Sequence, residues 1–364
     1  MFDFVPLENY TAIYLNVCLF YMIFTFIQGY LVPLDDHRNR SFINIAGYSL
    51  LLLIIFYMGL RPLSHKYFGD MLPYANYFKD YASGGEITTI KDVYFHYFMK
   101  FTSYFLTVSQ FFLLCAAMYV LPMYVISKKY FKEYWFYAFF VFIVSFQFWP
   151  YGTNGIRNGI ASSFFLMGIA YYDRKYLMFL FFLIACLFHN SLLLPILAFC
   201  ICFLYNKPKI YLYVWLACIP FSIAFGSNFE NLIASSGFGN DRLETYLSGD
   251  LGENTGFRYD FLLYSASAVY TGWYFIFKRK FDDKIYRKLF NTYLMTNAFW
   301  ILVIRANFSN RFAYLSWFMI GLIIIYPFLK VRFFERQHPV IVWVVSAYFF
   351  FTYFMIFIYY ALIK

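Results

Sequence analysis

The hydrophobic pattern of this 364-residue chain consists of long apolar runs separated by short polar segments. Residues 10–34, 41–60 and 340–363 are clear examples. A helix needs roughly 20 apolar residues to cross a hydrocarbon layer about 30 Å thick, because it rises about 1.5 Å per residue. The pattern therefore predicts an all-α polytopic membrane protein.

We expect about twelve transmembrane helices, within a range of roughly 10–13 that the length of the runs allows. The predicted segments are 10–34, 41–60, 101–126, 134–149, 155–172, 176–188, 191–205, 209–225, 261–277, 289–305, 311–328 and 339–362. His189 and Asn190 interrupt the continuous apolar run 176–205, which predicts a tight hairpin or a broken helix there. Residues 1–364 are expected to form a single integral membrane domain.

Composition and charge support this fold class and exclude several others. Hydrophobic residues make up 62% of the chain and charged residues only 13%, with a mean hydropathy of +0.59. A soluble domain is nearer a quarter charged. The net charge of +10 lies mainly in short loops, such as 128–132 and 278–288, as expected for cytoplasmic loops. We therefore expect no nucleic-acid partner. The six cysteines lie in apolar runs without metal-ligand spacing, and no metal or cofactor is expected.

With the N-terminus outside, two long loops, 61–100 and 226–260, fall on the non-cytoplasmic face. The first contains the stretch Tyr74–Tyr81, which predicts a short amphipathic helix at the membrane interface. The second combines six acids with interspersed aromatic residues. Such a loop suits sugar binding, because carboxylates accept hydrogen bonds from hydroxyls and aromatic faces stack on sugar rings; a merely solvated loop is the alternative.

Four arginines near predicted outer helix ends are candidates for anion binding. Arg61 and Arg305 close helices at their C-terminal ends, where the helix dipole favours a cation and a structural role is plausible. Arg157 and Arg311 fall in the first turn of their helices, where a cation is disfavoured unless an anion binds it together with the free backbone N–H groups. Asn154 is expected to cap the helix of Arg157. The pattern indicates a phosphate or diphosphate site, with contacts to lipid headgroups or loop acids as the alternative.

Two further residues are candidates for proton transfer. His189 follows a short apolar helix, and its imidazole has an ordinary pKa near 6.5, suited to a general base or to a donor toward phosphate. An isolated interfacial histidine is more often a satisfied structural group. Asp70 is the alternative base, although most loop aspartates form turns.

The order of these motifs resembles the EpsG/Wzy-type family of bacterial polysaccharide repeat-unit polymerases. The matching stretches are Gly59-Leu-Arg61 followed by Asp70 and Tyr74, Gly155-Ile-Arg157-Asn-Gly-Ile-Ala161, Leu187-Phe-His189-Asn-Ser-Leu192 and, more weakly, Asn310-Arg311-Phe-Ala-Tyr314. The resemblance covers roughly residues 55–200 and, more loosely, 300–330.

The resemblance implies a metal-independent glycosyltransferase in the bacterial inner (cytoplasmic) membrane, with a GT-C-like architecture and an active site facing the periplasm. Its donor and acceptor would be undecaprenyl-diphosphate-linked oligosaccharides, and its partners membrane lipids, a chain-length regulator and a flippase. Arg157 and Arg311 would bind the diphosphate, with Arg61, Arg305 and Asn154 assisting. His189 would be the first choice of base and Asp70 the second.

Two other functions fit a polytopic protein of this composition. A membrane O-acyltransferase would modify surface sugars with an acyl donor from the cytoplasm. A polysaccharide flippase would be expected to carry charged residues at mid-membrane and inverted repeats. In this chain the candidate charges cluster at predicted helix ends, which favours the polymerase.

Overall fold

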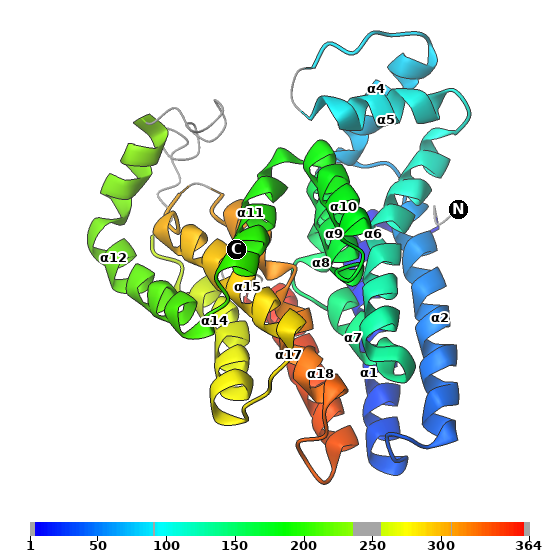
Figure 1. Ribbon diagram of the computed structural model, residues 1–364. Coiled ribbons are helices and arrows are strands. Elements are labelled where there is room, and N and C mark those ends of the chain that lie inside the picture. Colours follow the sequence, from blue (N-terminus) through cyan, green and yellow to red (C-terminus); the bar gives the residue numbers. More distant parts are fainter. Residues whose placement is uncertain (1–3, 90–91, 236–255, 307, 360–364) are drawn as a thin grey trace. The chain divides into compact units, whose positions relative to one another are not determined.

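The computed structural model describes residues 4–89, 92–235, 256–306 and 308–359, and every regular element in these ranges is a helix (Figure 1). The chain divides into two compact units, residues 1–192 with 328–364 and residues 193–327. Each unit has its own helical core. The single membrane domain expected for 1–364 stays a prediction.

The first unit contains the candidate residues of the N-terminal half. Its helices are η1 (Leu7–Asn9), α1 (Tyr10–Leu31), α2 (His37–Gly59), α3 (His65–Phe68), α4 (Met71–Ala82), α5 (Val93–Ser103), α6 (Val108–Phe131), η2 (Lys132–Tyr134), α7 (Trp135–Ile143), α8 (Phe148–Thr153), α9 (Ile156–Ala170), α10 (Lys175–Phe188), η3 (Asn190–Leu192), α18 (Gln337–Phe354) and η5 (Met355–Tyr359).

The second unit is built around a buried helix with many polar side chains. Its helices are α11 (Leu193–Leu204), α12 (Pro208–Ser235), α14 (Tyr259–Trp273), η4 (Tyr274–Lys278), α15 (Lys284–Leu302), α16 (Asn310–Trp317) and most of α17 (Ile320–Lys330). Asn297 on α15 is fully buried and donates to the hydroxyls of Ser265 and Ser316, at 3.2 and 3.0 Å. Its side-chain oxygen accepts from the indole of Trp215 at 2.8 Å. These bonds satisfy polar groups that would otherwise be costly in an apolar interior.

Helices α2 and α6 pack antiparallel along their length. A Cβ on Gly59, at the end of α2, would lie 2.6 Å from the Cα of Leu113 near the start of α6. At the other end, Arg40 forms a 3.0 Å ion pair with Glu133, which directly follows α6. Thr107 and Gln110 cap α6 reciprocally, each side chain accepting from the backbone N–H of the other.

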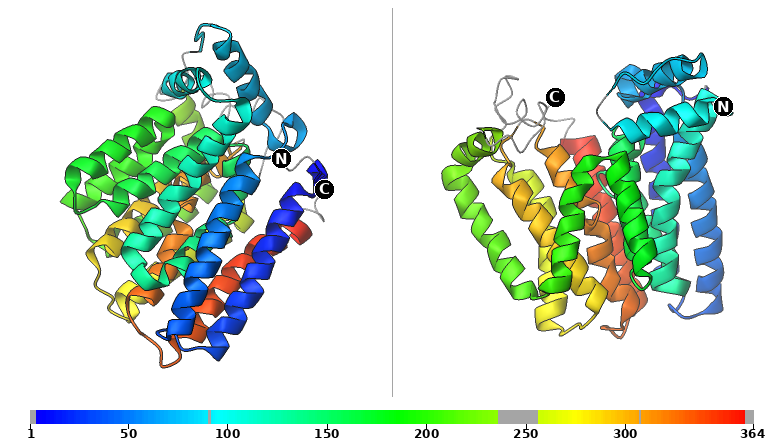
Figure 2. Two further views of the ribbon diagram at one scale, coloured as in Figure 1. Left: turned by 90° about the vertical axis from the view of Figure 1, so that its right-hand side faces the viewer. Right: turned by 45° about the horizontal axis from the view of Figure 1, so that its top comes forward.

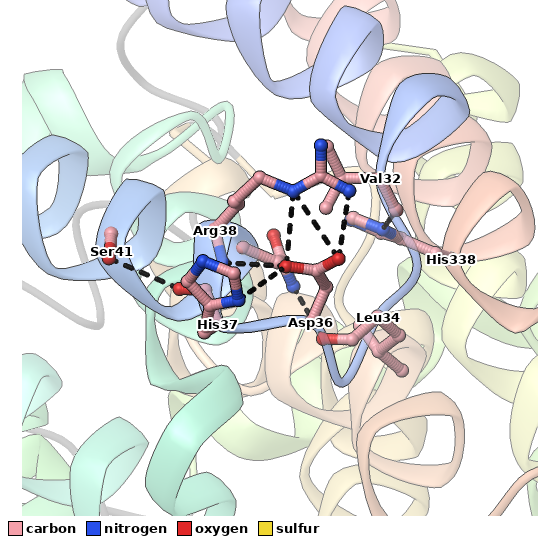
Figure 3. Close-up of polar contacts among 8 residues, drawn as sticks. Val32, Leu34, Asp36, His37, Arg38, Ser41 and His338 are labelled. Carbon is pink, nitrogen blue, oxygen red and sulfur yellow. Dashed lines mark hydrogen bonds and ion pairs between the residues drawn. The ribbon is translucent and has the colours of Figure 1, made fainter.

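The turn between α1 and α2 is held by a helix from the far end of the sequence. His338 of α18 is buried, and its Nδ1 lies 2.6 Å from the carbonyl oxygen of Val32 (Figure 3). Figure 2 shows α1 and α18 side by side. Asp36 caps α2 by accepting from the backbone N–H of Arg38 at 2.8 Å. Hydrogen bonds from Arg38 lower the pKa of Asp36 to about 2.

The prediction of a polytopic membrane protein is confirmed. In the described residues, fewer helices than the predicted twelve are long and apolar enough to cross a membrane. Six candidate membrane spans are found in the described residues: Leu7–Leu31, His37–Gly59, Val108–Ile143, Pro208–Gly226, Asn310–Lys330 and Gln337–Tyr359. Helices α9, α10 and the segment Asn190–Leu204 are apolar but shorter. Leu31, Ile45 and Leu204 are at least 72% exposed, a pattern typical of surfaces that face lipid. Twelve spans and a GT-C-like architecture stay predictions.

One predicted boundary is wrong, whereas one predicted segment and one predicted break agree with the structure. The first long loop is largely helical, because α3, α4 and α5 occupy much of 61–100, and α4 includes the predicted helix 74–81. The segment expected at 101–126 begins as α6 only at Val108, where the Thr107 cap lies. The candidate span Pro208–Gly226 matches the expected segment 209–225, and helix α12 itself continues to Ser235. The run 176–205 breaks at His189 as expected.

Candidate functional site

The first turn of α9 presents Arg157 to a cluster of polar groups from α4 and α5. Helix α9 begins at Ile156, so Arg157 lies in the first turn as the sequence predicts. Its Nη1 lies 2.7 Å from Oδ2 of Asp92, the residue that precedes α5. The two side chains are only 16% and 14% exposed. The guanidinium carbon also lies 5.6 Å from the ring centroid of Tyr74 on α4. Arg157 therefore pairs with a loop acid, one of the alternatives that the sequence leaves open, and does not extend into lipid headgroups.

The N-cap expected at Asn154 is wrong. The N-cap of α9 is Gly155, which makes no side-chain bond, and Asn154 ends the preceding helix α8. The Asn154 side chain instead accepts from the backbone N–H of Asp70 at 3.1 Å. Asn154 thus fixes the start of α4 against the α8–α9 corner. The backbone N–H groups of Asn154 and Gly155 both donate to the carbonyl of Pro150, so Asn154 belongs to the end of α8 and not to the start of α9.

A glycine makes this contact between Asp70 and Asn154 possible. Gly69 has a positive φ of +38°, and a Cβ at this position would lie 2.0 Å from Oδ1 of Asn154. A side chain here would separate the two segments, and a residue with a Cβ rarely adopts this backbone. The sequence Gly69-Asp70 therefore positions the carboxylate at the α8–α9 corner.

Asp70 connects to Arg157 through Tyr74. The Tyr74 hydroxyl donates to Oδ2 of Asp70 at 3.3 Å, and its ring lies beneath the Arg157 guanidinium. Burial raises the pKa of Tyr74, so its hydroxyl stays protonated and acts as a donor. The structure thus brings Asp70, Tyr74, Asn154 and Arg157 together; with Asp92 they form what we call the Arg157 cluster.

Asp92 is the member of this cluster that sequence reasoning missed. It precedes α5 with φ +48°, a left-handed backbone that is uncommon for residues other than glycine. Asparagine and aspartate tolerate this conformation best, and such outliers are frequent at functional sites. A single aspartate in a polar loop carries no sequence signal of its partner, because Arg157 lies 65 residues later.

His96 lies one turn into α5 and borders the cluster. The residue is buried, and its Nδ1 lies 2.9 Å from the hydroxyl of Tyr81. Burial and the nearby positive charge of Arg157 lower the pKa of His96, while Asp92 acts in the opposite sense. A neutral imidazole at this position adds no second cation beside Arg157.

His189 ends α10 in the same unit and has a defined tautomer. Its Nδ1 accepts from the backbone N–H of Ser191 at 3.3 Å and lies 2.8 Å from the Ser191 hydroxyl. An accepting Nδ1 places the proton of a neutral imidazole on Nε2. The adjacent Phe188 packs on Phe95 of α5, with ring centroids 5.9 Å apart. This tautomer favours the role of a donor toward phosphate over that of a base at Nε2.

Arg61 is a buried link between two helix ends. Its Nη1 donates to the carbonyl of Met58 at 2.5 Å and its Nη2 to that of Thr153 at 3.0 Å. These carbonyls belong to the last turns of α2 and α8, where backbone acceptors lack partners within the helix. Arg61 is 4% exposed, and burial lowers its pKa to about 10, so it remains cationic at neutral pH. These contacts favour the structural role that its position at a helix end allows.

Arg305 and Arg311 lie in the second unit. Arg305 donates to the carbonyls of Ser222 and Ile223 on α12, at 2.5 and 3.2 Å, which again favours a structural role. Arg311 is in the first turn of α16 as predicted, and its guanidinium lies 4.9 Å from the ring of Phe308. Most of the acidic loop 226–260, predicted to bind sugar, lies outside the described residues.

The Arg157 cluster combines a sequestered cation, two carboxylates and a phenol donor. A guanidinium in the first turn of a helix can bind a phosphate together with unpaired backbone N–H groups. A carboxylate beside it can accept a proton or orient the cation. Within the described part of the chain, no group of three histidine, cysteine, aspartate or glutamate residues is arranged to hold a metal ion.

Comparison with known proteins assigns a family over most of the chain. A family model described as the EpsG family matches residues 47–363, a range that begins within α2, extends beyond α18 and contains all the candidate residues. No curated protein and no solved structure matches the chain at a significant level. Because the matched range covers far more than half of the sequence, the chain belongs to the EpsG family.

Proposed function

We propose that this protein is a membrane glycosyltransferase that polymerises undecaprenyl-diphosphate-linked oligosaccharide units into a surface polysaccharide on the external face of the inner membrane. Membership of the EpsG family supports a polysaccharide polymerase. The observation that carries the proposal is Arg157, a largely buried cation in the first turn of α9, which is paired with Asp92. Such a pair can exchange its carboxylate for the diphosphate of a lipid-linked sugar.

The proposed reaction transfers the growing chain from its lipid diphosphate to an incoming unit. The acceptor hydroxyl oxygen attacks the anomeric carbon, the bond from that carbon to the diphosphate oxygen breaks, and the hydroxyl proton passes to a base. The diphosphate is a good leaving group, so stabilising its developing charge is the main demand. Arg157 and the N–H groups of the first turn of α9 meet this demand without a metal.

The proton-transfer roles follow from the two candidate residues. Asp70 is the proposed base, because its carboxylate is held by Tyr74 and its backbone by Asn154 within the Arg157 cluster. His189, with its proton on Nε2, is the proposed donor to a phosphate oxygen. Replacing His189 by Gln retains an N–H donor, whereas Ala removes it. We therefore expect His189→Gln to keep more polymerase activity than His189→Ala; equal loss in both would favour His189 as the base.

Polysaccharide gel analysis of a deletion strain tests the function. We expect a surface polymer reduced to a single repeat unit, restored by the wild-type chain but not by Arg157→Ala, since losing one charge-stabilising donor costs about 10²–10³-fold in rate. Arg38→Ala is the matched control. Arg38 also pairs with an aspartate, but its side chain is 62% exposed and lies at the end of α2 remote from Arg61. Unchanged ladders in the deletion strain would contradict the proposal. Loss of acyl groups with normal chain length would indicate an O-acyltransferase instead.

The orientation requires a separate measurement. Lys66→Cys and Lys129→Cys place exposed thiols near opposite ends of α2, while the native cysteines are buried or half-buried. We expect a membrane-impermeant maleimide to label Lys66→Cys in intact cells and Lys129→Cys only after the membrane is opened. The reverse pattern would place the Arg157 cluster in the cytoplasm and overturn the proposed site.

A further inference from the structure

A positively charged pocket lies at the end of α2 and α6 remote from Arg61. The cavity has a volume of about 330 Å³. Five side chains from the start of α2, the last turn of α6 and the following turn line it: Arg40, Asn44, Lys128, Lys132 and Glu133. Three cations and one carboxylate give the lining a formal charge of +2. No part of the proposed glycosyl transfer uses this pocket.

Trp135 lies beside this pocket and contacts two of its lining residues, Asn44 and Lys128. A Cβ on Gly47 would lie 2.3 Å from the indole of Trp135, so only glycine lets the ring insert against α2. The indole N–H donates to Oδ1 of Asn44 at 3.4 Å, and Lys128 Nζ lies 5.3 Å from the ring centroid. Lys132 has φ +47°, which turns the chain out of α6 and toward Glu133.

An apolar and aromatic strip continues from the pocket along α2 and α6. Tyr48 and Tyr124 flank Trp135, with ring centroids 5.1 and 5.0 Å from it. Farther along the two helices, Leu52 is 56% exposed and Leu121 42%. Aromatic residues concentrate at the level of lipid headgroups, and apolar side chains cover the hydrocarbon. The pocket and strip together match the charge and apolar parts of one phospholipid.

The length of α2 places this pocket at a membrane surface. A helix of 23 residues, His37–Gly59, extends about 34 Å at roughly 1.5 Å per residue, close to the thickness of the hydrocarbon layer. Arg61 and Arg40 therefore lie near opposite surfaces. Because the Arg40 end also carries Lys128 and Lys132, it has the basic character expected of a cytoplasmic end.

We propose that this pocket binds the phosphate headgroup of an anionic phospholipid, whose acyl chain lies along the strip between Tyr48 and Leu121. A phosphate can accept from Lys128 and Lys132 and share Arg40 with Glu133, since its charge complements the net positive lining. The adjoining apolar strip favours a lipid over a soluble phosphate. This inference is independent of the proposed glycosyl transfer.

Native mass spectrometry of the purified full-length protein tests the site. The probes are phosphatidylglycerol, phosphatidylcholine with the same acyl chains, and glycerol 3-phosphate without acyl chains. We expect phosphatidylglycerol to bind more tightly than phosphatidylcholine, and Lys128→Gln with Lys132→Gln to weaken it roughly fivefold per lysine. The control pair, Lys129→Gln with Lys330→Gln, removes the same charge outside the pocket lining and should leave binding unchanged. Lys129 and Lys330 lie over the rings of Tyr171 and Tyr130, outside the lining of the pocket.

The substitution Glu133→Gln is expected to strengthen the binding of phosphatidylglycerol, in contrast to the lysine substitutions. It removes the only acid of the lining and releases Arg40, so phosphatidylglycerol should bind roughly fivefold more tightly. Equal binding of the two lipids, equal losses in both lysine pairs, or no gain in Glu133→Gln would each overturn the proposal. Binding of glycerol 3-phosphate as tight as that of phosphatidylglycerol would overturn the lipid as occupant.

Discussion

Arginines lie near both ends of α2, in opposite environments. Arg61 is 4% exposed and donates to the backbone carbonyls of Met58 and Thr153. At the other end, Arg38 has a 62% exposed side chain and pairs with Asp36, two residues away. The buried arginine joins distant segments and the exposed one joins neighbours. The partner of an arginine and its burial, rather than its position beside an apolar run, therefore decide what it contributes to stability.

The largest effect is expected from removing the buried arginine. Arg61→Ala leaves two buried carbonyls without their donor and opens a void, which should cost about 2–4 kcal/mol in the free energy of unfolding. The midpoint of thermal unfolding, measured on the detergent-purified protein, reports this loss. Arg61→Lys keeps one donor and should recover part of it. An unchanged midpoint of unfolding in Arg61→Ala would show that the buried Arg61 contributes no more to stability than the exposed Arg38.

The next largest effect is expected from Asp92, which forms an ion pair with Arg157 and competes with an anion for it. Asp92→Asn removes a competing carboxylate, so inorganic pyrophosphate should bind roughly tenfold more tightly, on the scale of one charge-assisted hydrogen bond in a largely buried pair. Isothermal titration calorimetry measures the affinity. The control variant Asp36→Asn removes a carboxylate at the start of α2, the end remote from Arg61, and should leave the affinity for pyrophosphate unchanged. A weaker affinity in Asp92→Asn would show that Asp92 orients Arg157 for the anion rather than competing with it.

A smaller effect is expected from the exposed pair. Arg38→Ala should change the free energy of unfolding by less than about 1 kcal/mol, because exposed ion pairs gain little and are screened by salt. The same thermal measurement at low and high salt checks this. A loss comparable to that of Arg61→Ala would contradict the distinction drawn between the two ends.

The smallest effect is a pH dependence at His96. Burial and Arg157 lower the pKa of His96 in the folded protein, whereas the unfolded chain titrates near 6.5. The unfolded state therefore binds the proton first, and stability falls as pH drops below about 6.5 toward the lowered pKa. Melting temperatures between pH 7.5 and 5 should fall less steeply in His96→Gln than in the wild type. Identical slopes would show that His96 carries no part of the dependence.

Periodicity and end signals predicted much of the fold. The apolar runs placed most of the long helices, the break at His189 and the helix 74–81, because these depend on local sequence. The start of α6 at Val108 was missed although Thr107-x-x-Gln110 is a capping box. Helix α5 was also missed, since its mixture of aromatic and polar residues continues into the apolar run that follows.

The candidate site was only partly readable from the sequence. Arg157 and Arg311 were correctly placed in first turns, because the start of a helix leaves local marks. The partner of Arg157 is Asp92, and Asn154 bonds Asp70 rather than capping its own helix. Both contacts are made between segments more than 60 residues apart, where tertiary packing chooses the partner. No pattern along the chain specifies such a choice.

The double contact of Arg61 also bears on motion. By joining the last turns of α2 and α8, it couples the corner that precedes α9 to a helix long enough to cross the bilayer. We therefore expect the backbone of the first turn of α9 to stay in place when a substrate enters. Rearrangement is expected in α4, which carries Tyr74, and in α5, which Asp92 precedes. Hydrogen–deuterium exchange should then change in the peptides of α4 and α5 and in the first turn of α9, whose N–H groups would bind the diphosphate, and stay constant in those of α8.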